Sequence, residues 1–300
     1  MRRLFVGYKA ADLPAELLGE GAVCHVLDCY HARRIESAHP SVEVICSPHL
    51  PQGEWDEIRF RTGPKLMSGE LSLDLMQEIH LLKPKRFELD FVGRERERND
   101  LLNKMKEKPG RVRDFSAVWP ASVPGGEKLM FTSFPGCFCH RRLDEGGLAL
   151  AEVVTRDLSS ASPLSLLDMG CGCGLVGLLV AKAVGILKLT MIDSHARAVE
   201  AAKLNAKNFG VDAEVVLADD GIASMDADGA FDVFVGNPPY YSDYRIAEIF
   251  LDTARRSLRK GGACYTVVKN DAGLRPVQER YFPSVEVIRR RGYCVLKSVN

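Results

Sequence analysis

The second half of the chain alternates short apolar runs with longer amphipathic segments. The apolar runs are typical of buried strands, and they lie at residues 163–169, 188–193, 214–219, 231–236 and 263–269. Helical patterns separate them, at residues 175–184, 194–209 and 243–259. Strands that alternate with helices of this length predict a parallel sheet with helices on both of its faces.

Proline and glycine mark the ends of several of these elements. Asn-Pro-Pro at 237–239 ends the fourth strand, because proline cannot continue in the interior of a sheet. Gly-Gly at 261–262 is expected to end the last helix of the series. Two further apolar runs, 285–290 and 293–299, flank a glycine and predict a closing pair of strands.

Residues 55–92 resemble residues 231–268 without a gap, at a constant offset of 176 positions. One interpretation is that any two strand–helix–strand units look alike; the other is a duplicated fold whose first copy lost its chemistry. The first segment has no glycine-rich loop, and it has Arg-Thr-Gly-Pro at 61–64 where the second has Asn-Pro-Pro-Tyr at 237–240. These differences favour the decayed duplicate.

Charge is balanced over the whole chain but not along it. The 300 residues include 40 Lys and Arg against 40 Asp and Glu, which excludes a protein that coats nucleic acid through its bulk field. Residues 83–113 nevertheless contain eleven basic against six acidic residues, and residues 255–297 contain eleven against three. The stretch 93–115 predicts a solvated helix and a linker. Both basic regions are either solvated faces or surfaces for RNA.

The remaining composition indicates a globular protein of a reducing compartment. Hydrophobic residues make up 46%, enough for a full core, and the two close cysteine pairs are C-x-C, which is not the C-x-x-C spacing of zinc sites. The N-terminal apolar stretch is cut by Gly7, Lys9 and Asp12 before a signal-peptide core forms. We therefore expect a cytoplasmic protein without a metal or a membrane span.

A glycine-rich loop follows the strand at 163–169 and opens the next helix. In LLDMGCGCGLVG at 166–177 the alternating glycines let the backbone turn tightly and approach a ligand. Asp168 can accept a hydrogen bond from a ligand amine or order the loop. Asp193 ends the next strand, where a carboxylate can accept from both hydroxyls of a ribose. Asp219 follows the third strand and is placed to contact an adenine amino group, with Asp220 as its exposed neighbour.

The same loop also satisfies G-x-G-x-x-G through Gly172, Gly174 and Gly177, so a dinucleotide site is an alternative. Two features favour S-adenosylmethionine instead: an acidic residue before an alternating G-x-G-x-G, and a downstream Asn-Pro-Pro-Tyr. Cys171 is interpreted as a residue that fills the loop rather than as a nucleophile. Ser194 and His195 lie at a helix start, where capping is the usual role.

Asn237, Pro238, Pro239 and Tyr240 form the predicted chemical motif. The Asn237 side-chain oxygen and the Pro238 carbonyl can each accept one N–H of a planar amine, which orients its lone pair toward a methyl donor. The two prolines stiffen that carbonyl, and Tyr240 offers a ring on which a base or an amide can stack. Positioning supplies most of the rate gain, and no metal is needed.

These motifs together resemble the class I S-adenosylmethionine-dependent methyltransferases. Within that class the chain is similar to the ribosomal-RNA guanine 2-amino family, small-subunit methyltransferase C and large-subunit methyltransferase G. The resemblance rests on PGCF and LDEGGLAL within 135–150, LLDMGCGCGLVGLLVA at 166–181, GNPPYY at 236–241 and VIRRRGYCVLK at 287–297. It covers residues 130–300 well.

The resemblance implies a Rossmann-like α/β domain with a seven-stranded sheet and a C-terminal hairpin, preceded by a smaller, degenerate methyltransferase-like α/β domain. The expected domains are 1–115, with the charged linker, and 116–300. The expected partner is ribosomal RNA or a ribosomal subunit. Phe134 to Phe138 would border the cofactor or the substrate. The expected S-adenosylmethionine contacts are Asp168, Gly170, Cys171, Gly172, Gly174, Asp193, Ser194, Asp219, Asp220 and Asn237.

The chain departs from the family pattern at Cys137, where an aliphatic residue is usual, and at Tyr-Ser-Asp at 241–243. These changes bear on which base is methylated. Three other functions stay open on the sequence. One is a glutamine-amide N-methyltransferase of the release-factor type, whose N-terminal domain would be small and helical. The others are a non-catalytic RNA-binding scaffold and a dehydrogenase.

Overall fold

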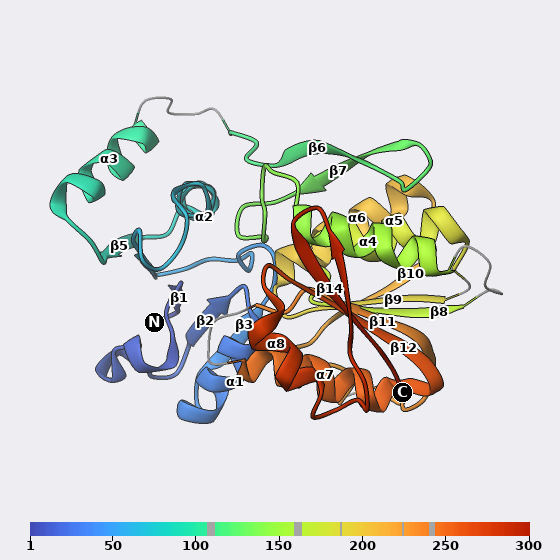
Figure 1. The fold of residues 1–300 in the computed structure, drawn as a ribbon. Coiled ribbons are helices and arrows are strands. Elements are labelled where there is room, and N and C mark those ends of the chain that lie inside the picture. The colour runs from blue at the N-terminus through green and yellow to red at the C-terminus, as the bar shows by residue number, and fades with distance from the viewer. Residues whose placement is uncertain (107–111, 159–163, 187, 224, 240–243) are drawn as a thin grey trace. The chain divides into compact units, whose positions relative to one another are not determined.

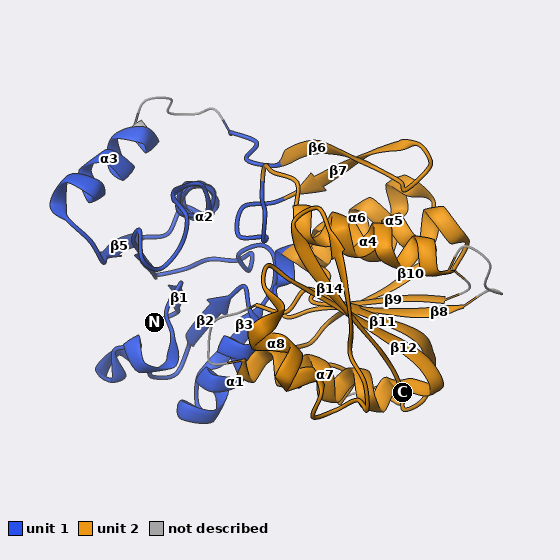
Figure 2. Ribbon diagram, in the orientation of Figure 1, with its two compact units in different colours: residues 1–116, 134–140, 195–197 blue, residues 117–133, 141–194, 198–300 orange. Residues whose placement is uncertain are grey.

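The computed structural model describes residues 1–106, 112–158, 164–186, 188–223, 225–239 and 244–300. The chain forms two compact units (Figure 2). Unit 1 contains residues 1–116, 134–140 and 195–197, and unit 2 contains residues 117–133, 141–194 and 198–300. No helix in these described ranges is both long and apolar enough to cross a bilayer.

Unit 2 is built on a seven-stranded sheet of order β10-β9-β8-β11-β12-β14-β13 (Figure 1). The first five strands in this order are parallel, and the last two pair antiparallel. The strands are β8 (Ser165–Met169), β9 (Lys188–Asp193), β10 (Ala213–Leu217), β11 (Phe231–Gly236), β12 (Leu258–Val268), β13 (Glu286–Arg290) and β14 (Tyr293–Val299). The predicted parallel sheet and closing strand pair are confirmed.

Helices cover both faces of this sheet, with α4, α5 and α6 on one face and α7 and α8 on the other (Figure 1). They are α4 (Glu145–Leu158), α5 (Leu175–Val184), α6 (Ala196–Phe209), α7 (Arg245–Ser257) and α8 (Asp271–Gln278). The core on the α7 side includes Phe234, Phe250 and Leu251, each buried. A separate two-stranded sheet joins β6 (Ala117–Ser122) to β7 (Lys128–Ser133).

The prediction that Gly-Gly at 261–262 ends a helix is wrong. Helix α7 ends at Ser257, and both glycines lie within β12. The Gly261 N–H donates to the Asn300 carbonyl oxygen at 2.7 Å, so this part of the strand is tied to the C-terminal end of the chain. The two glycines therefore lie inside an irregular strand. The pairing of β12 with β11 shifts register between Phe231 and Val233 of β11.

Unit 1 contains a five-stranded parallel sheet of order β3-β2-β1-β4-β5. Its strands are β1 (Arg3–Val6), β2 (Ala22–Val26), β3 (Glu43–Cys46), β4 (Glu57–Thr62) and β5 (Arg86–Phe91), and its helices are α1 (Cys29–Ala38), α2 (Gly69–Leu82) and α3 (Glu95–Lys106). Two short 3-10 turns, Ala10–Asp12 and Ala15–Leu17, join β1 to β2. The strand order matches that of β10-β9-β8-β11-β12 in unit 2.

The offset of 176 residues relates secondary-structure elements of units 1 and 2 as well as their sequences. Adding 176 to the bounds of α2 gives 245–258, and α7 spans 245–257. Phe5 pairs with Arg59 in unit 1, while Asp168 pairs with Val235 in unit 2. Because Arg59 and Val235 are related by the offset, Phe5 of unit 1 occupies the position that Asp168 has in unit 2.

The same comparison identifies what unit 1 has at two other positions of the predicted site. Val6 pairs with His25, so the next residue, Val26, takes the place of Asp193. Arg61 takes the place of Asn237 by the offset. Unit 1 therefore keeps the strand order of unit 2 without the carboxylates or the amide, which supports the interpretation as a degenerate copy.

Candidate active site

The glycine-rich loop is a tight turn held against the neighbouring strand. The backbone N–H groups of Gly170 and Cys171 donate to the Ile192 carbonyl oxygen at 2.8 and 3.0 Å. Gly170, Gly172 and Gly174 have φ of 67°, 56° and 85°, a region that strongly favours glycine. The predicted alternation of glycines is thus required by the backbone itself.

The glycines of the loop differ in the room beside them. A Cβ added to Gly172 would meet no atom within 4 Å, whereas one added to Gly170 would lie 2.7 Å from the Phe250 ring. Gly170 is needed for packing, and Gly172 leaves backbone open to a ligand. Asp193 lies beside this opening, because its Oδ2 accepts the Gly172 N–H at 2.8 Å.

Asp168 stabilises the end of the glycine-rich loop through a buried hydrogen bond. It is buried, and its Oδ2 accepts the backbone N–H of Gly177 in the first turn of α5 at 2.8 Å. A Cβ at Gly177 would lie 2.9 Å from that oxygen. Gly177 therefore makes room for Asp168, which accounts for the third glycine of G-x-G-x-x-G without a dinucleotide. Burial raises the pKa of Asp168 to about 7, with a smaller rise from Asp193, against the lowering effect of the Gly177 hydrogen bond.

This pKa predicts how stability depends on pH. Because the folded state holds the proton of Asp168 more tightly, the carboxyl destabilises the fold as pH rises from about 4 to about 7. Asp168→Asn should remove that loss, worth roughly 1.4 kcal/mol for each pH unit in the window. Urea unfolding of both proteins without ligand at pH 5 and pH 8 should show a gap that widens with pH. A gap independent of pH would contradict the assignment.

The remaining predicted contacts, one serine and two aspartates, follow the same sheet edge. Ser194 follows β9 directly, while Asp219 and Asp220 lie just beyond β10, and all three are half-buried. The prediction that Asp220 is exposed is therefore wrong, because Asp220 is half-buried like Asp219. The structure thus places these predicted contacts at the carboxyl ends of neighbouring parallel strands, the edge where open α/β sheets bind ligands.

Asn237 lies at the end of β11, next to the glycine loop in sheet order. Its Nδ2 donates to Asp144 Oδ2 at 2.9 Å. A carboxylate accepts and does not donate, so this contact fixes which end of the amide is nitrogen. The Asn237 Oδ1 is then directed away from Asp144 as an acceptor. Pro238 is buried and Pro239 is half-buried, while Tyr240 lies outside the described residues.

Several other sequence candidates have no reactive environment. Cys171 is buried, and burial raises the pKa of its thiol well above the usual range, so it fills the loop as expected. Burial lowers the pKa of His195 to about 4, which keeps it neutral near pH 7. The segment 134–140 belongs to unit 1, where a Cβ at Gly136 would lie 3.0 Å from the His195 ring.

Sequence reasoning missed two polar side chains that support this region, Asp144 and Asn205. Asn205 of α6 is fully buried; its Oδ1 accepts from Thr132 N at 2.8 Å, and its Nδ2 donates to the carbonyl oxygens of Thr132 and Cys173 at 2.9 Å each. One amide thereby joins β7 to the glycine loop. Apart from its place on α6, no local sequence signal marks it.

Asn205→Leu should cost about 3 kcal/mol of unfolding free energy, since three backbone groups lose their partner inside the core. Urea unfolding measures this loss. Asn208→Leu on the exposed side of the same helix is the matched control and should change stability by less than about 0.5 kcal/mol. Equal stability of the two variants would contradict the buried role.

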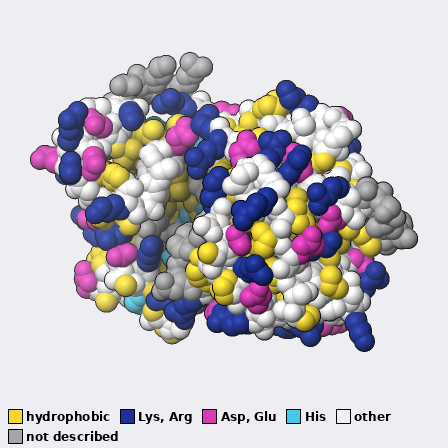
Figure 3. All heavy atoms as spheres, in the orientation of Figure 1, with side chains coloured by type: hydrophobic (Ala, Val, Ile, Leu, Met, Phe, Trp, Pro, Cys, Tyr) yellow, Lys and Arg dark blue, Asp and Glu magenta, His cyan; other side chains and the backbone are white. Residues whose placement is uncertain are grey.

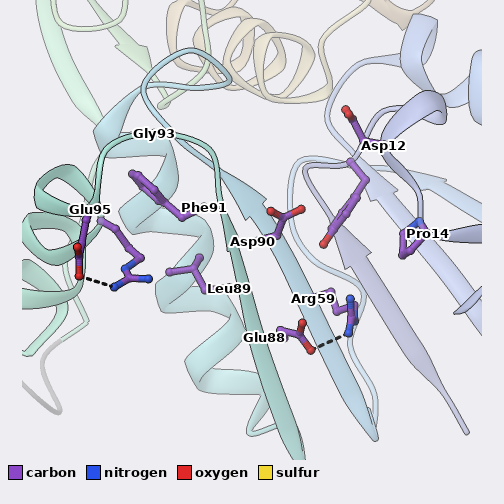
Figure 4. A pocket seen from close by; sticks show the side chains of 11 residues that line it. Asp12, Pro14, Arg59, Glu88, Leu89, Asp90, Phe91, Gly93 and Glu95 are labelled. Atoms are coloured by element: carbon purple, nitrogen blue, oxygen red, sulfur yellow. Dashed lines mark hydrogen bonds and ion pairs between the residues drawn. The ribbon is translucent and has the colours of Figure 1, made fainter.

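Unit 1 has a cavity of its own, of about 670 Å³, lined by residues of β4, β5, the segment after β1 and α3 (Figure 4). Its charged side chains are paired: Arg59 Nη2 donates to Glu88 Oε2 at 2.7 Å, and Arg98 Nη2 to Glu95 Oε1 at 3.4 Å. Figure 4 shows Arg59 and Glu88 reaching toward each other from adjacent strands. This lining does not reproduce the glycine loop and carboxylates of unit 2.

The fold and this set of residues define a methyltransferase. A family model for the methyltransferase small domain matches residues 128–297, and the chain belongs to that family. Enzymes of this fold and family take their methyl group from S-adenosylmethionine, so the predicted class and cofactor are confirmed and the dehydrogenase alternative falls away. The open backbone at Gly172 beside the Asp193 carboxylate fits such a ligand.

Three curated relatives carry the name ribosomal RNA small subunit methyltransferase C. The protein of Pseudomonas paraeruginosa is 35% identical over 161 residues, which covers 51% of this chain and 46% of the relative. That of Marinomonas sp. is 30% identical and covers 63% and 54%. The chain thus matches about half the length of these two. The Haemophilus influenzae protein is 28% identical over 99% of this chain and 93% of the relative.

Among the solved structures that resemble this chain is one whose match spans its whole length. It is a 16S rRNA N2 guanine methyltransferase of T. thermophilus in complex with AdoMet and guanosine, with a TM-score of 0.81. The match covers 100% of this chain and 88% of that one at 15% sequence identity, so it shows a shared fold. The predicted class I fold with a separate N-terminal domain is confirmed.

Proposed function

We propose that this protein transfers a methyl group from S-adenosylmethionine to the 2-amino group of a guanine in ribosomal RNA. The observation that carries the proposal is Asn237, whose amide is held by Asp144 so that its oxygen can accept from an amine at the ligand edge of the sheet. The name that these three curated relatives carry supports ribosomal RNA as the substrate.

The residues divide the work between binding and orientation. Asp193 accepts from the ribose hydroxyls, Gly172 leaves the backbone open beside it, and Asp168 keeps the start of α5 in place. S-adenosylmethionine supplies an electrophilic methyl group when bound. Asn237 Oδ1 and the Pro238 carbonyl accept the two N–H groups of the amine, which turns its lone pair toward the methyl donor and favours its pyramidal form.

Exposed basic side chains support an RNA substrate. Arg289 and Arg290 end β13 and Arg291 follows it, with 77%, 54% and 40% of their side chains exposed. Each forms an ion pair, with Asp271, Glu152 and Glu145 respectively, so their positive charge is partly balanced. Figure 3 shows lysine and arginine side chains spread over this face of the protein and interleaved with acidic ones. Such a surface permits local phosphate contacts without the bulk field that the neutral total excludes.

We further propose that residues 1–115 form a substrate-binding domain and residues 116–300 the methyltransferase domain, in the cytoplasm. The sheet of unit 1 argues against the release-factor type of glutamine methyltransferase, which would have a small helical domain there. The carboxylates and the amide retained in unit 2 argue against a non-catalytic scaffold.

The proposal is tested by incubating the full-length protein with labelled S-adenosylmethionine and either small ribosomal subunits, naked ribosomal RNA or release factors. The expected product is N2-methylguanosine in nuclease digests of the RNA. A labelled methyl on a glutamine side chain would support the alternative, and cofactor binding without transfer to any of them would leave only a scaffold.

A further inference from the structure

We infer that Asp144 is a positioning residue for methyl transfer, because it selects the orientation of the Asn237 amide that can receive the target amine. The inference rests on the proposed role of Asn237. Asp144 lies in unit 2 immediately before α4, and 93 residues separate it from Asn237.

The two oxygens of this carboxylate have different partners. Oδ1 accepts the backbone N–H of Gly146 at 3.0 Å, which caps the first turn of α4. Oδ2 accepts Nδ2 of Asn237 at 2.9 Å. The cap holds Asp144 on the rigid end of a helix, so the second oxygen has a defined position relative to β11.

The start of α4 is shaped around this carboxylate. A Cβ at Gly147 would lie 2.7 Å from Asp144 Oδ2, and a Cβ at Gly146 would lie 3.1 Å from the Tyr293 ring and 3.3 Å from Asp144 Oδ1. Both glycines are buried. Glycine is a poor residue inside a helix, so two in its first turn indicate that the space is needed. Gly146 and Gly147 therefore leave the space that the Asp144 side chain occupies.

The chemical reason is the asymmetry of the amide. In one orientation Asn237 offers an acceptor to the amine; rotated by half a turn, it offers two donors to groups that are themselves donors. A carboxylate at the other side accepts only, so it permits the first orientation and opposes the second. Asp144 thus preorganises an acceptor that would otherwise have two orientations.

One substitution separates this role from the helix cap. Asp144→Ser keeps an N-cap oxygen but shortens the side chain so that it no longer reaches Asn237. We expect kcat for the amine that the wild type methylates to fall about 30-fold or more, with KM for S-adenosylmethionine within about twofold. The melting temperature should fall by only about 3–8 °C, since one hydrogen bond to a charged group is lost and the cap is preserved.

Exchanging the partners tests the orientation itself. Asp144→Asn leaves a single side-chain oxygen for two donors, the Gly146 N–H and Asn237 Nδ2. When that oxygen keeps the helix cap, the new amide N–H faces the N–H of Asn237, and kcat should fall. Combining Asp144→Asn with Asn237→Asp restores a donor on one side and an acceptor on the other. This pair should recover roughly tenfold of the lost kcat relative to Asp144→Asn alone, a coupling that a purely structural role would not produce.

A readout without substrate keeps the inference independent of the proposed function. In the wild type, one side-chain N–H resonance of Asn237 should exchange slowly with solvent, and Asp144→Ser should make it exchange like an exposed amide. If no RNA is methylated but the resonance behaves so, the proposed function fails and the positioning contact stands. If the resonance is unchanged in Asp144→Ser, or kcat stays within twofold of wild type, the inference is overturned.

Discussion

Asn237→Ala is expected to lower kcat for methyl transfer about a hundred- to a thousandfold, while the Kd for S-adenosylmethionine changes by less than about threefold. The substitution removes an acceptor that meets the reacting amine and leaves the glycine loop and Asp193 in place. Loss of one preorganised polar contact to a reacting group typically costs this much in kcat. Single-turnover transfer of labelled methyl and calorimetric titration with the cofactor measure the two quantities.

The control is Asn208→Ala, which removes an exposed amide from α6 of the same unit. It should leave both quantities unchanged. If Asn237→Ala instead weakened cofactor binding and left the rate of the bound complex intact, Asn237 would belong to the cofactor site rather than to the amine site.

The second large effect is expected at Asp193. Asp193→Ala removes the acceptor for the ribose hydroxyls and also releases the Gly172 N–H, whose 2.8 Å bond orders the open part of the loop. Hydrogen bonds to charged groups are worth about 1.5–3 kcal/mol each, so the Kd for S-adenosylmethionine should rise at least about a hundredfold.

Asp212→Ala is the matched control for that experiment, because Asp212 is an exposed aspartate just before β10. It should bind the cofactor as the wild type does. Calorimetry at one pH and salt concentration compares the three proteins. Comparable weakening in both variants would indicate a general charge effect and not a contact at the loop.

Much of unit 2 could be predicted from sequence because its signals are local. The bounds of α5, β9 and β11 match the predicted residues 175–184, 188–193 and 231–236. Each is a dense apolar run delimited by glycine, proline or a charged residue. The end of α7 could not be found this way, because Gly261 and Gly262 look like a helix stop and their place in β12 depends on pairing with the C-terminal end of the chain.

The duplicated architecture could also be predicted from the sequence. The spacing of strands and helices is kept in a copy that has lost its catalytic and binding residues. What the letters could not show is the register that puts Phe5 and Val26 in the places of Asp168 and Asp193. That equivalence needs the pairing of strands far apart in the chain.

The predicted site residues came from motifs, whereas their supports did not. Asp144 and Asn205 bind partners that lie 93 and 73 residues away in the chain. The residues next to them in the sequence do not predict these hydrogen bonds. Gly177 shows the opposite problem, because it completed a dinucleotide pattern while its physical role is to admit the Asp168 carboxylate. A sequence motif thus predicts where a site lies, and the packing contacts give the physical reason for each of its residues.

The most direct test of the central claim is a mass map of modified nucleotides in ribosomal RNA from a strain lacking this gene. We expect one N2-methylguanosine to disappear, to return with the wild-type gene and to stay absent with the Asn237→Ala gene. An unchanged map of N2-methylguanosine in the deletion strain would contradict the proposed function.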